Sequence, residues 1–389
     1  MKYRRFGRTD YDVSVITSGG MRYQQSWKGS DPVSDESQEN LEKCIYKAID
    51  VGINHIETAR GYGTSELQLG KILPKLPRDE IYVQTKIGPS ADTDKFKAAF
   101  EKSISLLNVD YLDVFSFHGI NNEESLEAAL SCYEKHVKQW KEDGRVRDIG
   151  FSTHGDHRII CKALRTGIFD HVNLHWYYIN QENWPAIEEA KRQDSGVFII
   201  SPNDKGGLLY KPSEKLVELT APLHPMVFNG LFCLSKPEVH TLSCGVSRPE
   251  DFDVHVEMVE MMDRTEELLP PIIERLEAAL AESLGDEWAR NWDQGLPYWD
   301  ETPGEINVSV ILRLRNLAVA YDMIEYGKIR YNMLGNAGAW FPGNQSAEFD
   351  TEEIAAAVSQ SPLADKIPDA LADAHRLLKG EESKRLQVD

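Results

Sequence analysis

Four polar residues near the start of the chain could together move a proton: Glu57, Tyr62, Lys86 and His118. Each lies at or just after the end of an apolar run, and the carboxyl ends of strands are where α/β proteins keep their chemistry. A phenol with a pKa near ~10 is a poor acid at neutral pH, but a neighbouring ammonium favours its proton loss. We therefore predict Tyr62 as a general acid and Lys86 as the cation that lowers its pKa. Glu57 would hold Lys86, and His118 would orient a substrate oxygen. Considered alone, each residue could have a structural role instead: a tyrosine commonly packs against its neighbours, and a lysine at a strand end is commonly solvated.

The elements that must position these residues alternate between strand and helix along the chain. Eight apolar runs predict strands, at residues 15–18, 53–56, 81–85, 111–117, 146–151, 171–176, 197–200 and 239–243. Such alternation predicts a parallel sheet, and eight strand–helix units in ~260 residues predict a (β/α)8 TIM barrel. A doubly wound sheet is the alternative, but Gly19-Gly20-Met21-Arg22 after the first strand lacks the G-x-G-x-x-G spacing of its phosphate turn.

Two regions depart from this alternation. Residues 201–228 contain many prolines and glycines and predict a long irregular loop over the barrel mouth, where cofactor and substrate contacts are expected. After residue 262 the pattern is helical, with predicted helices at 268–284, 306–326 and 351–378. The sequence therefore predicts a barrel over residues 1–262 and an all-helical C-terminal extension over residues 263–389.

Composition limits the partners and the compartment. The net charge of −20 argues against a nucleic-acid partner, because such proteins need a clustered basic face. The five cysteines are dispersed, which is typical of reduced thiols and favours a cytoplasmic protein. Arg4-Arg5 is followed by no apolar run, so a twin-arginine export signal is not expected. No stretch approaches the ~18 apolar residues of a membrane span. An oligomer is compatible with all of these features.

The residues around Tyr62 form a recognisable motif. Glu57-Thr58-Ala59, Tyr62-Gly63, Ser65-Glu66 and Leu69-Gly70 resemble the Asp-Thr-Ala, Tyr-Gly, Ser-Glu and Leu-Gly signature of the aldo-keto reductases. Lys86 and His118 fall where the other two catalytic residues of that family lie. Glu57 replaces the family's Asp, which keeps the charge and lengthens the side chain by a methylene. The resemblance implies an NAD(P)(H)-dependent oxidoreductase that interconverts a carbonyl and an alcohol by direct hydride transfer, with Tyr62 as general acid and base.

The resemblance also implies cofactor contacts at the carboxyl ends of several strands and on the loops that follow them. The expected residues are Gly20, Met21, Ser152, Thr153, Asn173, Ser201, Pro202, Lys205, Gly207, Gly245, Ser247, Arg248 and His255. Ser152 and Asn173, which replaces the family's Gln, are expected beside the nicotinamide amide. Ser201 begins the loop whose backbone meets the pyrophosphate in the family. His255 replaces an Asn of the family beside the adenine.

The preference between the two nicotinamide cofactors depends on one turn. Gly245-Val246-Ser247-Arg248-Pro249 resembles the family's Gly-Val-Arg-Ser-Pro, in which a helix N-terminus points at phosphate. Ser247 and Arg248 could bind a 2′-phosphate, which favours NADP(H) over NAD(H). The alternative is that Arg248 only begins a surface helix.

The substrate is expected to be a small carbonyl or alcohol. Arg22, Tyr23 and Trp176 are the residues expected to line its site. Polar loop residues such as Asn203 and His224 favour a hydroxylated or sugar-like molecule over a steroid.

The C-terminal extension resembles a subgroup of the family whose last domain is ferredoxin-like. Ile306-Asn307-Val308 and Arg330-Tyr331-Asn332 are among the residues that carry this resemblance. The cluster cysteines of that subgroup are replaced here, at Asp293, Leu296, Trp299, Thr302, Ala339, Pro342 and Gln345. An iron–sulfur cluster needs thiolates, so a degenerate ferredoxin-like domain with no iron-sulfur cluster is predicted.

Other functions remain open at this point. Histidines at positions 154, 157, 171 and 175 raise the alternative of a metal site, but no carboxylate or cysteine pattern accompanies them, so no metal is expected. The replaced Asp and the lost cluster raise the alternative of a non-catalytic NADP(H)-sensing subunit. A third reading is a sugar-modifying enzyme that recycles a tightly bound nicotinamide cofactor.

Overall fold

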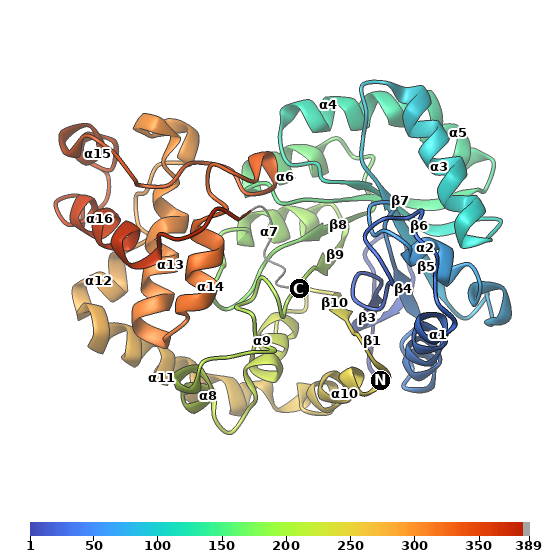
Figure 1. Ribbon diagram of the computed structural model, residues 1–389, viewed down its shortest axis with the longest axis horizontal. Helices are drawn as coiled ribbons and strands as arrows, with labels where there is room; N and C mark the ends of the chain where they lie inside the picture. The colour runs from blue at the N-terminus through green and yellow to red at the C-terminus, as the bar shows by residue number, and fades with distance from the viewer. Residues whose placement is uncertain (384–389) are drawn as a thin grey trace. The chain divides into compact units, whose positions relative to one another are not determined.

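The computed structural model describes residues 1–383. Among these residues, eight parallel strands close into a barrel in the order β10-β3-β4-β5-β6-β7-β8-β9, which confirms the predicted (β/α)8 TIM barrel (Figure 1). The strands are β3 (Ile16–Gly19), β4 (His55–Glu57), β5 (Tyr82–Ile87), β6 (Leu112–His118), β7 (Val146–Ser152), β8 (His171–Leu174), β9 (Gly196–Ile199) and β10 (Thr241–Gly245).

Helices alternate with these strands and cover the outside of the barrel (Figure 1). They are α1 (Asp35–Asp50), α2 (Ser65–Leu69), α3 (Thr93–Leu107), α4 (Glu123–Cys132), α5 (Lys138–Glu142), α6 (His157–Arg165), α7 (Trp184–Arg192) and α10 (Asp253–Glu260). Side-chain caps begin several of them: Ser34 accepts a hydrogen bond from the Ser37 amide at α1, and Asp92 from the Lys95 amide at α3. A π-helical turn, Tyr133–Val137, joins α4 to α5.

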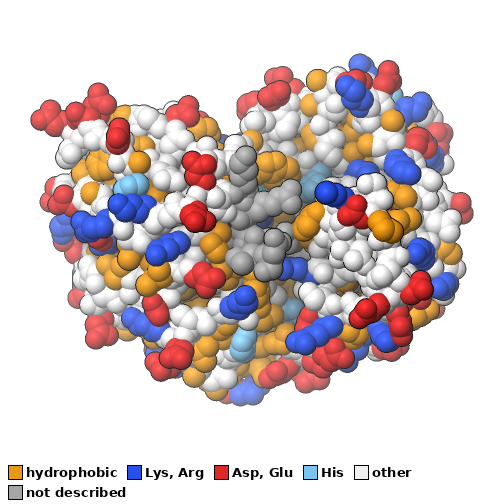
Figure 2. All heavy atoms as spheres, viewed as in Figure 1, with side chains coloured by type: hydrophobic (Ala, Val, Ile, Leu, Met, Phe, Trp, Pro, Cys, Tyr) orange, Lys and Arg blue, Asp and Glu red, His pale blue; other side chains and the backbone are white. Residues whose placement is uncertain are grey.

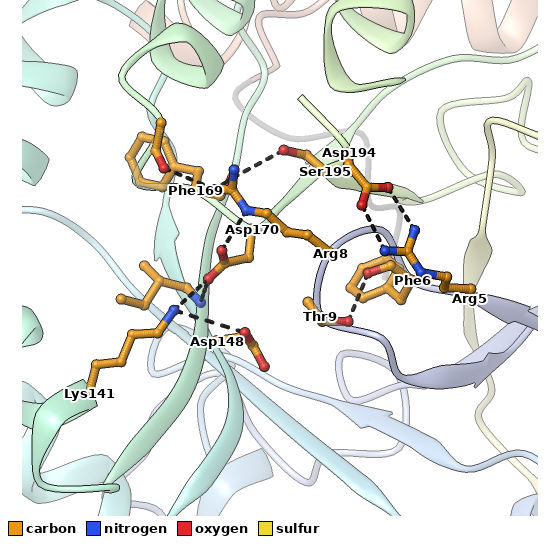
Figure 3. Close-up of polar contacts among 12 residues, drawn as sticks. Arg5, Phe6, Arg8, Thr9, Lys141, Asp148, Phe169, Asp170, Asp194 and Ser195 are labelled. Atoms are coloured by element: carbon orange, nitrogen blue, oxygen red, sulfur yellow. Dashed lines mark hydrogen bonds and ion pairs between the residues drawn. The ribbon is translucent and has the colours of Figure 1, made fainter. Parts of the chain in front are cut away.

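An antiparallel hairpin closes the barrel at the amino-terminal ends of its strands. The hairpin consists of β1 (Tyr3–Arg5) and β2 (Asp12–Ser14). Phe6 is fully buried and its ring packs directly on the first residue of β9. Figure 3 shows the polar contacts that hold this plug: Arg5 pairs with Asp194, and the Nε atom of Arg8 lies 2.8 Å from Asp170 Oδ1. The carboxyl ends of the strands therefore form the end of the barrel that can hold a site.

The segment between β9 and β10 contains two helices. The first, α8 (Glu214–Thr220), begins at Ser213, whose hydroxyl accepts a hydrogen bond from the Leu216 amide. The second, α9, spans Pro225–Leu234. The prediction of an irregular loop over residues 201–228 is therefore wrong for this part. Its prolines lie before, between or at the start of the helices, as Pro225 does, where they interrupt no helical hydrogen bond.

The chain divides into two compact units. The first comprises Met1–Pro202 and Asn229–Asp263 and contains the barrel, and the second comprises Asn203–Phe228 and Arg264–Asp389. The described part of the second unit is helical, with α8, α11 (Thr265–Leu284), α12 (Asp286–Asn291), α13 (Val308–Tyr321), α14 (Ile324–Tyr331), α15 (Thr351–Ala357) and α16 (Ile367–Leu378). Two contacts join its separated segments: Ser213 Oγ donates to the Tyr321 carbonyl at 2.7 Å, and Arg275 Nε donates to the Leu219 carbonyl at 3.0 Å.

Two long helices predicted for the extension are each divided in the structure. The pattern at 306–326 forms α13 and the start of α14, because Asp322 takes a left-handed conformation with φ of 54° and ends α13. The pattern at 351–378 forms α15 and α16, with a turn between them. Within residues 1–383, no helix combines the length and the apolar character needed to cross a bilayer.

The charged side chains at the surface are mixed in sign. On the face drawn in Figure 2, Lys and Arg side chains alternate with Asp and Glu, and the described residues form no extended basic area there. The chain as a whole carries 43 basic and 63 acidic residues. This distribution mainly favours solubility.

Candidate active site

A buried ion pair lies at the carboxyl ends of β4 and β5. Glu57 is the last residue of β4, and its Oε1 atom pairs with Nζ of Lys86 on β5. Lys86 Nζ also donates to the Thr58 carbonyl at 2.8 Å, and the lysine side chain is 1% exposed. Burial lowers the pKa of Lys86. An ammonium at this depth needs a paired carboxylate, and Glu57 supplies it despite its extra methylene.

Tyr62 lies over this lysine. The Lys86 Nζ atom is 4.9 Å from the centre of the Tyr62 ring, which is within the range of a cation–π contact. Burial raises the pKa of the Tyr62 phenol. The ammonium acts in the opposite direction, because a nearby positive charge favours the phenolate. The structure thus brings together the acid and the group predicted to tune it.

His118 completes the group of four predicted catalytic residues. It is the last residue of β6, and its ring meets the Tyr62 ring edge to face, with centroids 5.8 Å apart and an interplanar angle of 88°. Three consecutive barrel strands and the loop after β4 therefore deliver Glu57, Lys86, Tyr62 and His118 to one place.

The loop that carries Tyr62 is fixed by polar contacts to β5. The Arg60 amide donates to the Lys86 carbonyl at 2.9 Å. Glu66, which is 1% exposed, accepts from Thr85 Oγ1 at 2.7 Å and pairs with Arg60. Gly63 has a φ of +52°, and a Cβ atom there would collide with the Ser26 carbonyl oxygen. The position of the phenol is therefore set by side chains on both sides of it.

Two of the predicted nicotinamide ligands lie in register with His118. Ser152 is paired with His118 across β6 and β7, and with Asn173 across β7 and β8. Asn173 is fully buried, and neither its Oδ1 nor its Nδ2 atom has a hydrogen-bond partner among the described residues. A buried primary amide without partners is costly unless a ligand satisfies it, and a carboxamide is its natural complement. These residues therefore fit a nicotinamide group.

Other predicted cofactor residues have structural contacts of their own. Thr153 Oγ1 donates to the Ile120 carbonyl at 2.7 Å, so its hydroxyl holds a loop. The Gly20 amide donates to the Glu57 carbonyl at 2.7 Å, and a Cβ atom on Gly20 would lie 2.7 Å from that oxygen. Met21 follows Gly20 and is partly buried. Gly20 therefore allows the chain just after β3 to pack against the residues that begin the Tyr62 loop.

The loop after β9 is shared between the two units. Ser201 adopts a φ of 53°, and the buried Pro202 accepts from Asn229 Nδ2 at 2.9 Å within the first unit. Lys205 and Gly207 belong to the second unit, where the Lys205 carbonyl accepts from Tyr326 OH at 2.8 Å. Burial and the nearby Arg330 lower the pKa of Lys205 to about 7.

The turn after β10 has an internal counterion. Gly245 and Ser247 are exposed, and the Arg248 side chain, 72% exposed, pairs with Asp251 at a Nε–Oδ1 distance of 3.0 Å. His255 is buried in α10, and burial lowers its pKa to about 4, so that its imidazole is neutral near pH 7.

Of the three predicted substrate residues, two line a cavity beside the turn after β10 rather than beside Tyr62 and His118, and the third is buried. Arg22 and Tyr23 line a cavity of about 380 Å³ together with Ser247. Trp176 is 1% exposed and stacks on Phe232 with ring centroids 4.9 Å apart. The prediction that Trp176 lines the substrate site is therefore wrong. β8 ends at Leu174, and beyond it the Trp176 ring packs against Trp184 of α7 and Phe232 of α9.

The histidine set proposed as a possible metal site is dispersed by the fold. His171 lies deep in the barrel, where its Nε2 atom is 2.8 Å from Ser116 Oγ. His154 and His175 lie edge to face with ring centroids 4.5 Å apart. Within the described part of the chain, no group of three or more His, Cys, Asp or Glu side chains could hold a metal ion.

Comparisons with known proteins identify the family of the chain. A family model described as the Aldo/keto reductase family matches residues 15–208. The chain belongs to the aldo-keto reductase family. An aldo-keto reductase of Mycobacterium sp. (strain KMS) is 34% identical over 138 residues, which cover 35% of this chain and 49% of that protein. The chain thus spans about half the length of the first curated relatives that it matches. The uncharacterized oxidoreductase YqkF of Bacillus subtilis (strain 168) is 23% identical over 303 residues, covering 69% of this chain and 94% of YqkF.

Solved structures of other aldo-keto reductases share the fold. The holo form of an aldo-keto reductase from Bacillus halodurans is 20% identical, with a TM-score of 0.56 over 70% of this chain and 97% of that one. An aldo-keto reductase from Klebsiella pneumoniae, in complex with NADPH, is 18% identical, with a TM-score of 0.54 over 69% of this chain and 95% of that one.

Three residues that support the site were not among the site residues predicted from the sequence, although Glu66 belongs to the family signature. Ser243 Oγ on β10, two strands away from β4, donates to Glu57 Oε2 at 3.3 Å. Glu66 and Arg60 hold the Tyr62 loop as described above. Strand alternation on β10 could have placed Ser243 on the inner face, whereas no local pattern shows that Glu66 turns inward rather than stabilising the first turn of a helix.

Proposed function

We propose that this aldo-keto reductase interconverts a carbonyl and an alcohol with a nicotinamide dinucleotide, on a small hydroxylated or sugar-like substrate. One observation carries the proposal. Glu57, Lys86, Tyr62 and His118 form an unbroken series of contacts at the carboxyl ends of the strands. The unpartnered amide of Asn173 lies in register with this end of the barrel.

Each residue has a role that follows from its contacts. When bound, the nicotinamide exchanges a hydride with the substrate carbon. Tyr62 gives a proton to the oxygen during reduction and takes it back during oxidation. Lys86 stabilises the phenolate that remains, and Glu57 keeps Lys86 charged and in place. His118 hydrogen-bonds and orients the substrate oxygen beside the phenol.

The polar lining of the site favours a hydroxylated substrate. The Tyr62 hydroxyl and the His118 imidazole, which the proposal places beside the substrate, can both hydrogen-bond to a hydroxylated molecule. A site that recognises its substrate by hydrogen bonds disfavours an apolar steroid.

The Glu57–Lys86 ion pair weakens one reason for the alternative of a non-catalytic NADP(H)-sensing subunit. That alternative was motivated by the replacement of the family's Asp by Glu57, by the changes at Asn173 and His255 and by the lost cluster; of these, the first loses weight because Glu57 still forms the ion pair with Lys86. An NADP(H) preference would depend on Ser247 and Arg248.

The substitution Tyr62→Phe tests the proposal. It removes only the phenolic oxygen, so we expect kcat to fall roughly 10²–10⁴-fold while NAD(P)H still binds. Turnover is measured on a panel of aldehydes and sugars, and binding by quenching of NAD(P)H fluorescence. Tyr46→Phe, at an exposed position of α1, is the matched control and should keep full activity.

Unchanged turnover in Tyr62→Phe would refute the mechanism, and binding without turnover in the wild type would favour the sensor. Cofactor that copurifies at full occupancy would favour a recycling enzyme.

A further inference from the structure

We infer that the turn after β10 is built to exclude a 2′-phosphate, so that NAD(H) rather than NADP(H) is the cofactor, with Asp251 as the specificity-determining residue. This inference rests on the proposed function, because it assumes that a nicotinamide dinucleotide binds along this turn. It reverses the expectation drawn from Ser247 and Arg248 in the sequence.

At this turn, three hydrogen-bond donors that could bind a phosphate already bond to the Asp251 carboxylate. Asp251 Oδ2 accepts hydrogen bonds from the Ser247 amide at 2.9 Å and from the Arg248 amide at 3.2 Å. Asp251 Oδ1 accepts from Arg248 Nε at 3.0 Å. A carboxylate of the chain thus uses the two amides and the Nε–H group of Arg248, which a 2′-phosphate could otherwise contact.

The negative charge of Asp251 also opposes the binding of a 2′-phosphate at this turn. A phosphate monoester carries about −1.5 to −2 charges at pH 7, so it would meet a like charge at Asp251. The neighbouring residue Glu250 is also exposed and acidic. A 2′-phosphate would have to displace Asp251 from Arg248 and then remain beside it, whereas a free 2′-hydroxyl carries no such cost.

The adjoining cavity suits a ribose and a base better than a phosphate. It has a volume of about 380 Å³, within the range of small-molecule clefts. Besides Ser247, it is lined by hydroxyl and amide side chains, including those of Tyr23, Ser34 and Asn40. Its two charged residues, Arg22 and Glu36, have opposite signs. Hydroxyls, amides and a carboxylate are groups that hydrogen-bond a ribose diol and an adenine.

The cavity and the turn are part of one built structure. Asn40 Nδ2, on α1, donates to the Ser247 carbonyl at 2.7 Å. The stem of Arg22 lies against Gly245, since a Cβ atom there would be 2.9 Å from Arg22 Cγ. The contacts among α1, the loop after β3 and the turn after β10 therefore fix the shape that a dinucleotide would meet.

The experiment compares dissociation constants for NADH and NADPH, measured by fluorescence quenching at fixed low salt, in four proteins. In the wild type we expect NADH to bind at least roughly tenfold tighter than NADPH. In Asp251→Asn, which keeps the shape and removes the charge, we expect NADPH to gain roughly tenfold while NADH is unchanged. Adding Arg248→Ala to this variant should abolish the gain. Glu250→Gln is the matched control, because it removes a charge whose carboxylate accepts neither turn amide; it should change the ratio much less.

The outcomes separate this inference from the proposed function. A wild type that binds NADPH as tightly as NADH, or an Asp251→Asn variant with an unchanged ratio, overturns the inference alone. Failure of both nucleotides to bind the wild type overturns the proposed function and the inference with it. Unchanged NADH affinity reports that each variant is folded, and Asp251→Ser replaces Asp251→Asn if that variant does not fold.

Discussion

The ammonium of Lys86 lies 4.9 Å from the centre of the Tyr62 ring and pairs with Glu57 below it. The same nitrogen is therefore shared between a carboxylate that keeps it charged and a phenol whose proton loss it favours. This relationship makes the pH dependence of the reaction a direct test of the site.

Replacement of Lys86 by Met should shift the pH profile of alcohol oxidation. Oxidation needs the phenolate of Tyr62, whose pKa burial already raises. Loss of the ammonium raises that pKa further, so the rise of kcat/KM should move to higher pH by about 1 unit or more, with a lower plateau. The measurement is kcat/KM against pH in the oxidation direction. Lys97→Met, on the exposed face of α3, should leave the profile in place, and an unmoved profile in Lys86→Met would exclude Lys86 as the tuning cation.

Replacement of Glu57 by Gln should destabilise the fold as well as the chemistry. The variant leaves a lysine that is 1% exposed without its carboxylate, and breaking a buried pair in this way costs about 3–5 kcal/mol of unfolding free energy. Urea denaturation at pH 7.5 measures the loss. The control is Glu39→Gln, which breaks an exposed i,i+4 pair with Lys43 and should have no measurable effect. Equal stability of Glu57→Gln and the wild type would mean that Lys86 is neutral in the folded protein.

Asn173→Leu should weaken cofactor binding without destabilising the fold. Because neither amide atom of Asn173 has a partner among the described residues, the apo variant should be as stable as the wild type or more stable, by up to about 1–2 kcal/mol. Nicotinamide cofactor affinity should fall roughly tenfold, the value of one or two hydrogen bonds. Asn229→Leu is the matched control. Its amide donates to the Pro202 carbonyl at 2.9 Å, so it should destabilise the fold. If both variants lose stability equally, Asn173 is a structural residue.

His255 should make the fold sensitive to acid. Burial lowers its pKa from 6.5 to about 4, so between these values the unfolded chain binds a proton that the folded chain does not. The unfolding free energy therefore falls as the pH drops through this window, by on the order of 3 kcal/mol from this residue. Burial lowers the pKa of His55, His171 and His240 as well, so His255→Asn should make the dependence between pH 7 and 4.5 shallower without abolishing it, as measured by urea denaturation. His157→Asn, at a partly exposed position, should not. A slope that is equally steep in His255→Asn would show that other groups cause it.

The barrel and the meeting of its four polar residues could be predicted because both follow from local patterns. Strand–helix alternation determines that the carboxyl ends meet at one face, so Glu57, Lys86 and His118 converge without any knowledge of the packing. The inner face of β8, which carries His171 and Asn173, also follows from alternation, whereas Trp176 lies beyond the end of β8 and its packing against α9 does not.

Other features depend on contacts that no local pattern reveals. Arg248 and Asp251 are three residues apart, and their pairing depends on how the turn after β10 closes. The unpartnered amide of Asn173 is visible only once its neighbours are placed. Helix α8 was missed because proline content was read without regard to position, although Ser213 is a clear helix cap.

The plug at the closed end of the barrel has a consequence for how this protein is made. Arg8 bonds to Asp170, 162 residues later, and Arg5 to Asp194, 189 residues later. A ribosome adds ~5–20 residues per second, so Phe6 waits ~10 s or more before its burial site exists. During that interval an aromatic side chain is open to chaperones and to neighbouring nascent chains, and the rate of translation past Asp194 sets how long the exposure lasts.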